Sequence, residues 1–90
     1  MSTSEHPAAA ENAALRELLA VIAEAAEVPL PAHPTDSNML AYYRALGRRA
    51  DHIGIYADLG ADISVTALRF RAAGLRELID DEPLGYEAAS

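Results

Sequence analysis

The chain lacks cysteine and lysine, and each absence removes a class of structure or function. Without cysteine there are no disulfides, no thiol nucleophile and no thiolate ligands for a metal ion. Without lysine, all seven basic residues are arginines; against 14 acidic residues they leave a net charge of −7. Such an acidic balance disfavours a protein that coats nucleic acid or an anionic membrane.

A long hydrophobic run is also missing. The longest one, within residues 18–26, is interrupted by Glu24 and falls short of the roughly 20 apolar residues that a membrane-spanning helix needs. No basic stretch followed by an apolar one opens the sequence, so no signal peptide is expected. These features predict a cytoplasmic protein without membrane contact.

What the sequence contains in excess is alanine, which accounts for 20 of its 90 residues. Because alanine is small, we expect a thin core and closely spaced helices. A chain of this length forms one small domain. No segment alternates between polar and apolar residues for long enough to be a strand, whereas three segments have helical periodicity. The predicted fold class is therefore all-α.

The three periodic segments are separated by residues that end or begin helices. We predict helices over residues 8–27, 36–59 and 63–79, a frayed start over residues 1–7 and an acidic tail over residues 80–90. The expected architecture is a three-helix antiparallel bundle, or a helical hairpin with the N-terminal helix packed across it. We expect it to self-associate.

Capping residues support these limits. Thr35, Asp36 or Ser37 can cap the second helix, because their side-chain oxygens accept hydrogen bonds from its first amide groups. Gly60 is placed to end that helix, and Asp62 to cap the third. The segment between the first two helices contains three prolines and should be a stiff, extended connector.

The second predicted helix carries a stripe of mainly small residues. Its members recur at alternating steps of three and four: Leu40, Tyr43, Gly47, Ala50, Gly54, Ala57 and Ala61. Glycine costs a helix about 1 kcal/mol relative to alanine, so two glycines on one stripe need an explanation. Either they let another helix approach closely, within the chain or from a second copy, or they kink the helix.

The third predicted helix has two apolar stripes. Val65, Leu68, Ala72, Leu75 and Ile79 form one, and Ile63, Ala67, Phe70 and Gly74 form the other. A surface helix ordinarily buries a single face. The second stripe therefore indicates either a helix sandwiched between the other two or a surface for self-association.

No constellation of residues points to catalysis. The three histidines, His6, His33 and His52, share no metal-ligand spacing. Glycine-rich phosphate loops, paired carboxylates and a Ser-His-Asp order are all missing. We therefore expect no enzymatic activity, no cofactor, no metal and no small-molecule substrate.

Residues 59–75 resemble the helix-turn-helix of MerR-type regulators. Those proteins contain Val-Ser-x-x-Ala-Leu-Arg-Tyr followed by Ala-Gly-Leu; this chain has Ala67-Leu68-Arg69-Phe70 and then Ala73-Gly74-Leu75, with a spacing that differs by one residue and no wing afterwards. The resemblance implies a small DNA-binding regulator. The residues that it would turn toward phosphates or base edges are Ser64, Thr66, Arg69 and Arg71.

The Asp36-Ser37 pair at the start of the second helix is similar to the Asp-Ser of acyl carrier proteins, whose serine accepts phosphopantetheine. Here Asn38 follows, where the carrier motif has leucine. A second similar stretch runs from Leu59 to Ser64. This resemblance implies a carrier modified on Ser37 or Ser64.

Our leading hypothesis is a non-enzymatic module that acts through helix-to-helix contacts. Its partner would be itself, as a homodimer, or another helical protein, and nucleic acid is disfavoured. The middle of the chain, residues 35–76, holds six arginines and four aspartates and is flanked by acidic ends. The predicted interface residues come from the stripe of the second helix and from the second apolar stripe of the third helix. They are Tyr43, Gly47, Gly54, Ile63, Phe70 and Gly74.

Overall fold

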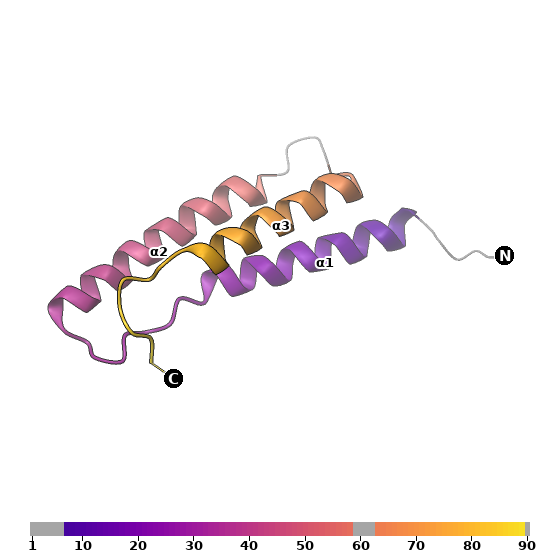
Figure 1. The fold of residues 1–90 in the computed structure, drawn as a ribbon. Coiled ribbons are helices and arrows are strands. Elements are labelled where there is room, and N and C mark those ends of the chain that lie inside the picture. Colours follow the sequence, from indigo (N-terminus) through magenta and orange to yellow (C-terminus); the bar gives the residue numbers. More distant parts are fainter. Residues whose placement is uncertain (1–6, 59–62, 90) are drawn as a thin grey trace.

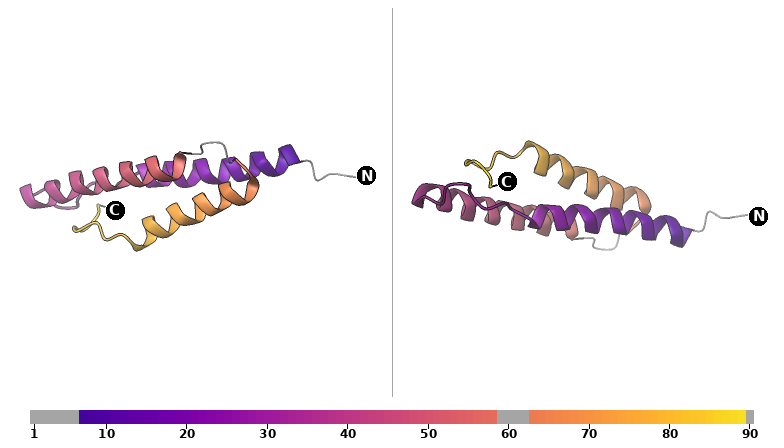
Figure 2. Two further views of the ribbon diagram at one scale, coloured as in Figure 1. Left: turned by 90° about the horizontal axis from the view of Figure 1, so that it is seen from above. Right: turned by 90° about the horizontal axis from the view of Figure 1, so that it is seen from below.

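The computed structural model describes residues 7–58 and 63–89, and three helices account for most of them (Figure 1). The helices are α1 (Pro7–Ala26), α2 (Asp36–Ala57) and α3 (Val65–Asp81). α1 and α3 run in the same direction and α2 runs against both. Seen from above and below, α3 lies on one side of the layer that α1 and α2 form (Figure 2). The predicted all-α class and three packed helices are confirmed.

The helix limits agree with the predicted ones to within two residues. Thr35 is the N-cap of α2, as predicted, and its Oγ1 accepts a hydrogen bond of 3.2 Å from the amide of Asn38. Three residues with predicted roles at the end of α2 and the start of α3 lie outside the described residues: Gly60, Ala61 and Asp62.

The predicted N-cap of α3 was wrong. The cap is Ser64, whose Oγ accepts a hydrogen bond of 3.2 Å from the amide of Ala67. Serine is among the preferred N-cap residues because its side-chain oxygen satisfies a free amide of the first turn, and Val65, the first residue of the helix, packs on the core.

The core is thin and lies mainly between α1 and α3. Its buried members are Ala14, Leu18, Val21, Ala25, Leu68, Ala72 and Leu75. Of these, Leu68 and Leu75 are the largest side chains that are fully buried. Three of these buried residues are alanines, and small side chains in a core let packed helices approach each other closely.

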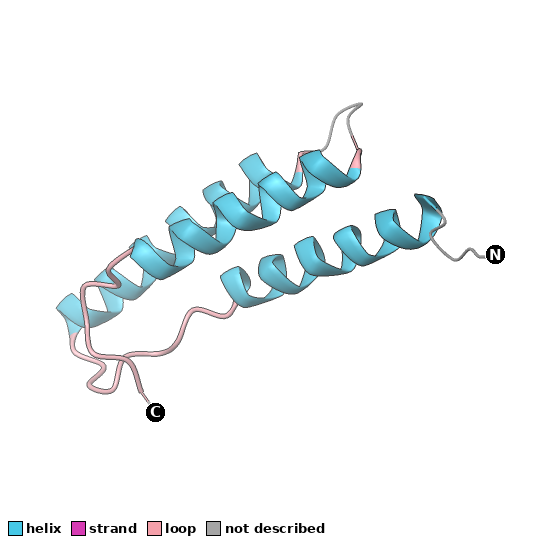
Figure 3. Ribbon diagram, turned by 45° about the vertical axis from the view of Figure 1, so that its right-hand side comes forward, coloured by secondary structure: helices cyan, strands magenta, loops and turns pink. Residues whose placement is uncertain are grey.

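α2 lies against both other helices (Figure 3). Its two buried residues are Ala45 and Arg49, while Ile53 and Tyr56 are partly buried against the core. Gly74 of α3 lies directly against Tyr56 of α2, since a Cβ atom at Gly74 would lie 2.6 Å from Cε1 of Tyr56. The second apolar stripe of α3 is thus partly explained by α3 packing between its neighbours.

Residues 82–89, which we predicted as part of an acidic tail, fold back along the connector that joins α1 to α2. The amide of Ala32 donates to the carbonyl oxygen of Glu87 at 2.8 Å, and the hydroxyl of Tyr86 donates to the carbonyl oxygen of Pro29 at 2.7 Å. Gly85 has a φ of +87°, which allows the turn that returns the chain. The C-terminal segment thereby holds the proline-rich connector in place.

We predict opposite effects on stability for alanine at two glycines. Gly74→Ala should lower the free energy of unfolding by about 1 kcal/mol or more, because the Tyr56 ring has to move from its packed position. Gly47→Ala should raise it by about 0.5–1 kcal/mol, because the new methyl group meets nothing and alanine favours the helix. Urea unfolding followed by circular dichroism measures both. Equal effects of the two substitutions would contradict this packing.

Candidate functional site

One face of α2 is turned away from the bundle and is apolar from Leu40 to Ala57. We call it the outer face of α2, and its members are all exposed: Leu40, Tyr43, Gly47, Ala50, Gly54 and Ala57. The helical period places it opposite Ala45 and Arg49, the two residues that α2 buries. Leu40 and Tyr43 are the large members, and they are 50% and 61% exposed.

The glycines of the outer face serve no packing within the chain. A Cβ atom at Gly47 or Gly54 would have no heavy atom within 4 Å other than its own helix and chain neighbours. The alternative in which these glycines admit another helix of the same chain is therefore wrong, because α1 and α3 lie against the opposite face. Each glycine still costs the helix about 1 kcal/mol. A contact with a second molecule remains a prediction for this face.

Tyr43 is supported by a neighbouring aromatic ring. Its ring centroid lies 5.4 Å from that of Tyr42 in an edge-to-face arrangement, and Tyr42 in turn lies 6.4 Å from Tyr86. Such pairs are favourable by about 0.5–1.5 kcal/mol beyond the area they bury. Through Tyr86, the C-terminal segment therefore helps to support the tyrosine side chain exposed on the outer face.

The other predicted interface residues lie elsewhere. Gly74 faces Tyr56 inside the bundle, whereas Ile63 and Phe70 are exposed near the start of α3. Phe70, 74% exposed, borders an open hollow of about 710 Å³ between the end of α2 and the start of α3. The predicted set is thus divided. Three members lie on the outer face of α2, Phe70 borders the hollow, Gly74 makes an internal contact, and Ile63 is exposed just before α3.

The residues suggested by the helix-turn-helix resemblance are partly engaged within the chain. Nη1 of Arg71 lies 3.5 Å from the carbonyl oxygen of Ile55 and 3.4 Å from that of Tyr56, and donates to both at the C-terminal end of α2. A cation at this end also compensates the helix dipole. Ser64 caps α3, Thr66 lines the hollow and Arg69 is exposed.

Within the segment that resembles a helix-turn-helix, residues 65–75 form one continuous helix at the start of α3 (Figure 1). Contact between this helix and DNA stays a prediction. Ser37, the residue suggested by the carrier resemblance, is exposed in the first turn of α2.

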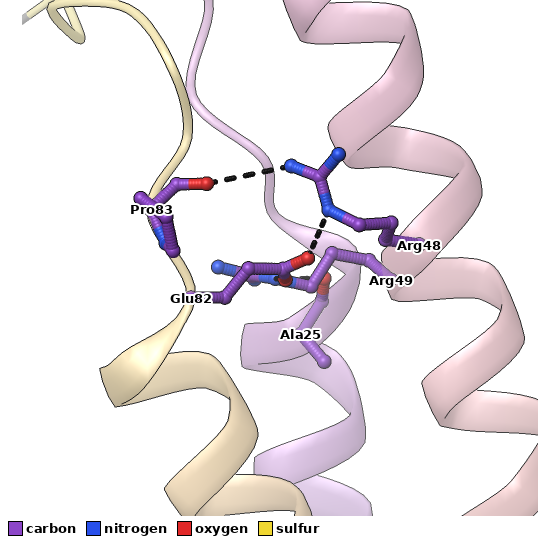
Figure 4. A network of polar contacts seen from close by, with 5 residues as sticks. All are labelled: Ala25, Arg48, Arg49, Glu82 and Pro83. Carbon is purple, nitrogen blue, oxygen red and sulfur yellow. Dashed lines mark hydrogen bonds and ion pairs between the residues drawn. The ribbon is translucent and has the colours of Figure 1, made fainter.

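A buried ionic network joins all three helices at one end of the bundle (Figure 4). Nε of Arg49 donates to Oε1 of Glu82 at 3.1 Å, and Nη1 of Arg49 donates to the carbonyl oxygen of Ala25 at 3.2 Å. Arg48 donates through Nε to Oε2 of the same carboxylate and through Nη2 to the carbonyl oxygen of Pro83. Arg49 is only 6% exposed, so its charge requires this carboxylate.

The network also sets the ionisation of Glu82. Burial acts to raise the pKa of its carboxyl group, but hydrogen bonds from Arg48 and Arg49 outweigh burial, and the pKa lies below the ordinary value of 4.5. His52, one turn further along α2, lies near enough for its charge to act in the same direction. The Nδ1 atom of His52 is buried without a hydrogen-bond partner among the described residues.

The sequence pattern does not reveal this network: residues 80–90 were expected to form an acidic tail, whereas Glu82 binds Arg48 and Arg49. One signal was present: Arg49 follows Ala45 by one helical turn and therefore lies on the face of α2 opposite the small-residue stripe.

A second long-range ion pair, between α1 and α3, is exposed. Arg76 binds Glu24 with both terminal nitrogens, with Nη1 to Oε1 at 2.6 Å, and this pairing lowers the pKa of Glu24.

The described residues hold neither a metal site nor a membrane-spanning helix. Over 7–58 and 63–89, no group of three His, Asp or Glu side chains is placed to bind a metal ion. The helices of this part of the chain also lack the combined length and hydropathy for crossing a bilayer. No protein family, curated protein or solved structure was found to match this chain.

Breaking the network on the arginine side should be costly. Arg49→Ala leaves Glu82 with one guanidinium partner and opens a void beside Ala25, so the free energy of unfolding should fall by about 3 kcal/mol. The control is Arg69→Ala, whose side chain is exposed and which should change stability by less than about 0.5 kcal/mol. Similar losses in the two variants, measured by urea unfolding, would contradict the structural role of Arg49.

The lowered pKa of Glu82 predicts a pH dependence of stability. The ionised carboxylate contributes its full stabilisation above the unfolded-state pKa of about 4.5, and this contribution is lost as the pH falls through the folded-state pKa. The difference in unfolding free energy between the wild type and Glu82→Gln should therefore be constant from about pH 6 to pH 8 and shrink below about pH 4.5. A difference that does not change with pH would show that ionisation of Glu82 does not matter.

Proposed function

We propose that this chain is a non-enzymatic interaction module that acts through helix-to-helix contacts, with a second copy of itself as its partner. The observation that carries the proposal is the outer face of α2, which is apolar, exposed along the helix and contains two glycines with no packing role in the chain. Contiguous exposed apolar surface of this kind is typical of interaction sites.

The composition of the face favours a helix as the occupant. Small residues recur on it at seven-residue intervals, with Gly47 and Gly54 at equivalent positions and Ala50 and Ala57 at the next pair. Small side chains at such positions let helix axes approach to about 8 Å, the lower end of the usual range. A repeat of seven residues keeps the same face turned toward the partner helix over several turns.

Self-association would also stabilise a chain whose stability as a monomer is expected to be low. Few large side chains are fully buried in the core, and a 90-residue domain buries a modest share of its surface on folding. Burial of Leu40 and Tyr43 against a second copy adds apolar contact that the monomer does not have.

The proposal is tested by sedimentation equilibrium at micromolar to near-millimolar concentrations. The wild type should show a mass that rises from 9.6 kDa toward twice that value. Gly47→Gln should remain monomeric, because a long side chain blocks the close approach while the open space around Gly47 leaves the monomer intact. Circular dichroism checks that the variant keeps its helices.

Ala73→Gln is the matched control. Ala73 is exposed on α3, away from the outer face of α2, so this substitution adds a similar side chain without touching the proposed contact. It should associate as the wild type does. A wild type that stays at 9.6 kDa throughout, or a Gly47→Gln variant that associates as tightly as Ala73→Gln, would overturn the proposal.

A further inference from the structure

We infer that two copies pair through α2 in antiparallel orientation, about a two-fold axis that passes midway between Gly47 and Ala50. This inference rests on the proposed self-association and adds its geometry. Two observations carry it: the distribution of large and small residues along the outer face, and the charged residues on the flank of that face.

Side-chain size changes along the outer face from one end of α2 to the other. The large residues Leu40 and Tyr43 lie in the first half of the helix, and every member from Gly47 onward is glycine or alanine. Parallel pairing would set Tyr43 beside Tyr43 of the partner subunit and Gly54 beside Gly54 of the partner subunit. The helices would then be held apart at one end and leave a gap at the other.

Antiparallel pairing matches large residues with small ones. With the axis between Gly47 and Ala50, Tyr43 lies opposite Gly54 of the partner subunit, and Leu40 lies opposite Ala57 of the partner subunit. The same contacts recur on the other side of the axis, because a two-fold interface is self-complementary. The separation of the helices is then similar at both ends, and the glycines accommodate the tyrosine rings.

The flank of the outer face carries charges that fit the same register. Arg44 and Asp51 are one heptad apart on one side of the face, and both are exposed. Neither side chain makes a hydrogen bond or ion pair with another described residue. In an antiparallel helix pair, the same flank of each helix meets its counterpart. Arg44 then lies beside Asp51 of the partner subunit, and this ion pair occurs twice.

A parallel pair has no such complementarity. There, one flank of α2 meets the opposite flank of the other copy. The opposite flank consists of Met39, Leu46 and Ile53, which carry no charge. Arg44 and Asp51 would lie beside apolar side chains and remain without partners, so charge favours the antiparallel arrangement.

The acidic character of the chain does not prevent this contact. The acidic excess lies entirely at the two ends of the chain, while residues 35–76 hold six arginines against four aspartates. The carboxylate of Glu82, close to α2, is bound by Arg48 and Arg49. Two copies therefore meet through the least acidic part of the molecule.

Charge reversal tests the register in the full-length chain. Arg44→Asp and Asp51→Arg each place like charges opposite one another twice, so each variant should self-associate more weakly, on the order of tenfold. The double variant Arg44→Asp/Asp51→Arg should recover wild-type affinity. An equimolar mixture of the two single variants should also recover it, because both ion pairs are attractive in the mixed dimer.

A spin label gives a second readout. Because the chain has no cysteine, Ser37→Cys introduces a single attachment site at the exposed start of α2. At a rise of about 1.5 Å per residue, the two labelled positions should lie roughly 35 Å apart in the antiparallel dimer. A parallel dimer would bring them to about 10 Å, the spacing of packed helices. Double electron–electron resonance distinguishes the two.

Each outcome decides a different claim. A monomeric wild type overturns the proposed function, and the register with it. A dimeric wild type whose charge-reversal variants show no rescue, or whose labels lie about 10 Å apart, leaves self-association standing and overturns the antiparallel register. Rescue in both the double variant and the mixture, together with the long distance, supports the inference.

Discussion

The guanidinium group of Arg49 connects all three helices, and the position of α2 depends on it. Ala45 is the other residue that α2 buries, and the larger side chains Ile53 and Tyr56 are only partly buried against the core. Arg49 reaches the last turn of α1 through the carbonyl oxygen of Ala25 and the end of α3 through Glu82. Burying the guanidinium group of Arg49 without the carboxylate of Glu82 would cost several kcal/mol of folding free energy. The need to keep the two groups together therefore fixes how α2 lies against the end of α3.

The rotation of α2 about its own axis follows from that contact. Once Arg49 points inward, the helical period turns Gly47 and Gly54 outward, because they lie on the opposite side of the same helix. The ionic network and the exposed apolar face are therefore two consequences of one helix orientation. Glu82, which supplies the carboxylate of this network, is also the first residue of the segment that folds back over the connector. That segment supports Tyr43 through the contacts of Tyr86 with Tyr42 and of Tyr42 with Tyr43. The end of the bundle that contains the ionic network therefore also supports Tyr43, a large residue of the proposed interaction surface.

Much of this fold could be predicted from local patterns, because helices depend on residues three and four positions apart. Apolar periodicity located all three helices, and Thr35 was identified among the possible caps of α2. The outer face of α2 was also visible as a stripe, although its orientation was not. A stripe that faces a neighbouring helix and one that faces solvent have the same sequence pattern, and the structure decides between them through the empty space around Gly47.

The features that escaped prediction are contacts between distant residues. Glu82 looked like part of an acidic tail, and its role depends on Arg48 and Arg49, more than thirty residues earlier. The hydrogen bonds between the C-terminal segment and the proline connector are likewise invisible to periodicity, since neither segment is regular. Gly74 was assigned to an interface because no local pattern shows that Tyr56 occupies the space beside it.

The antiparallel α2 dimer is tested most directly by an isotope-filtered NMR experiment on a mixture of labelled and unlabelled protein at a concentration where dimers form. This experiment detects only contacts between copies. We expect cross-peaks between the ring protons of Tyr43 and the α-protons of Gly54, and between the methyl groups of Leu40 and Ala57. Cross-peaks between copies that involve Phe70 and Ile63 in place of the outer face of α2, or none at all, would contradict this dimer.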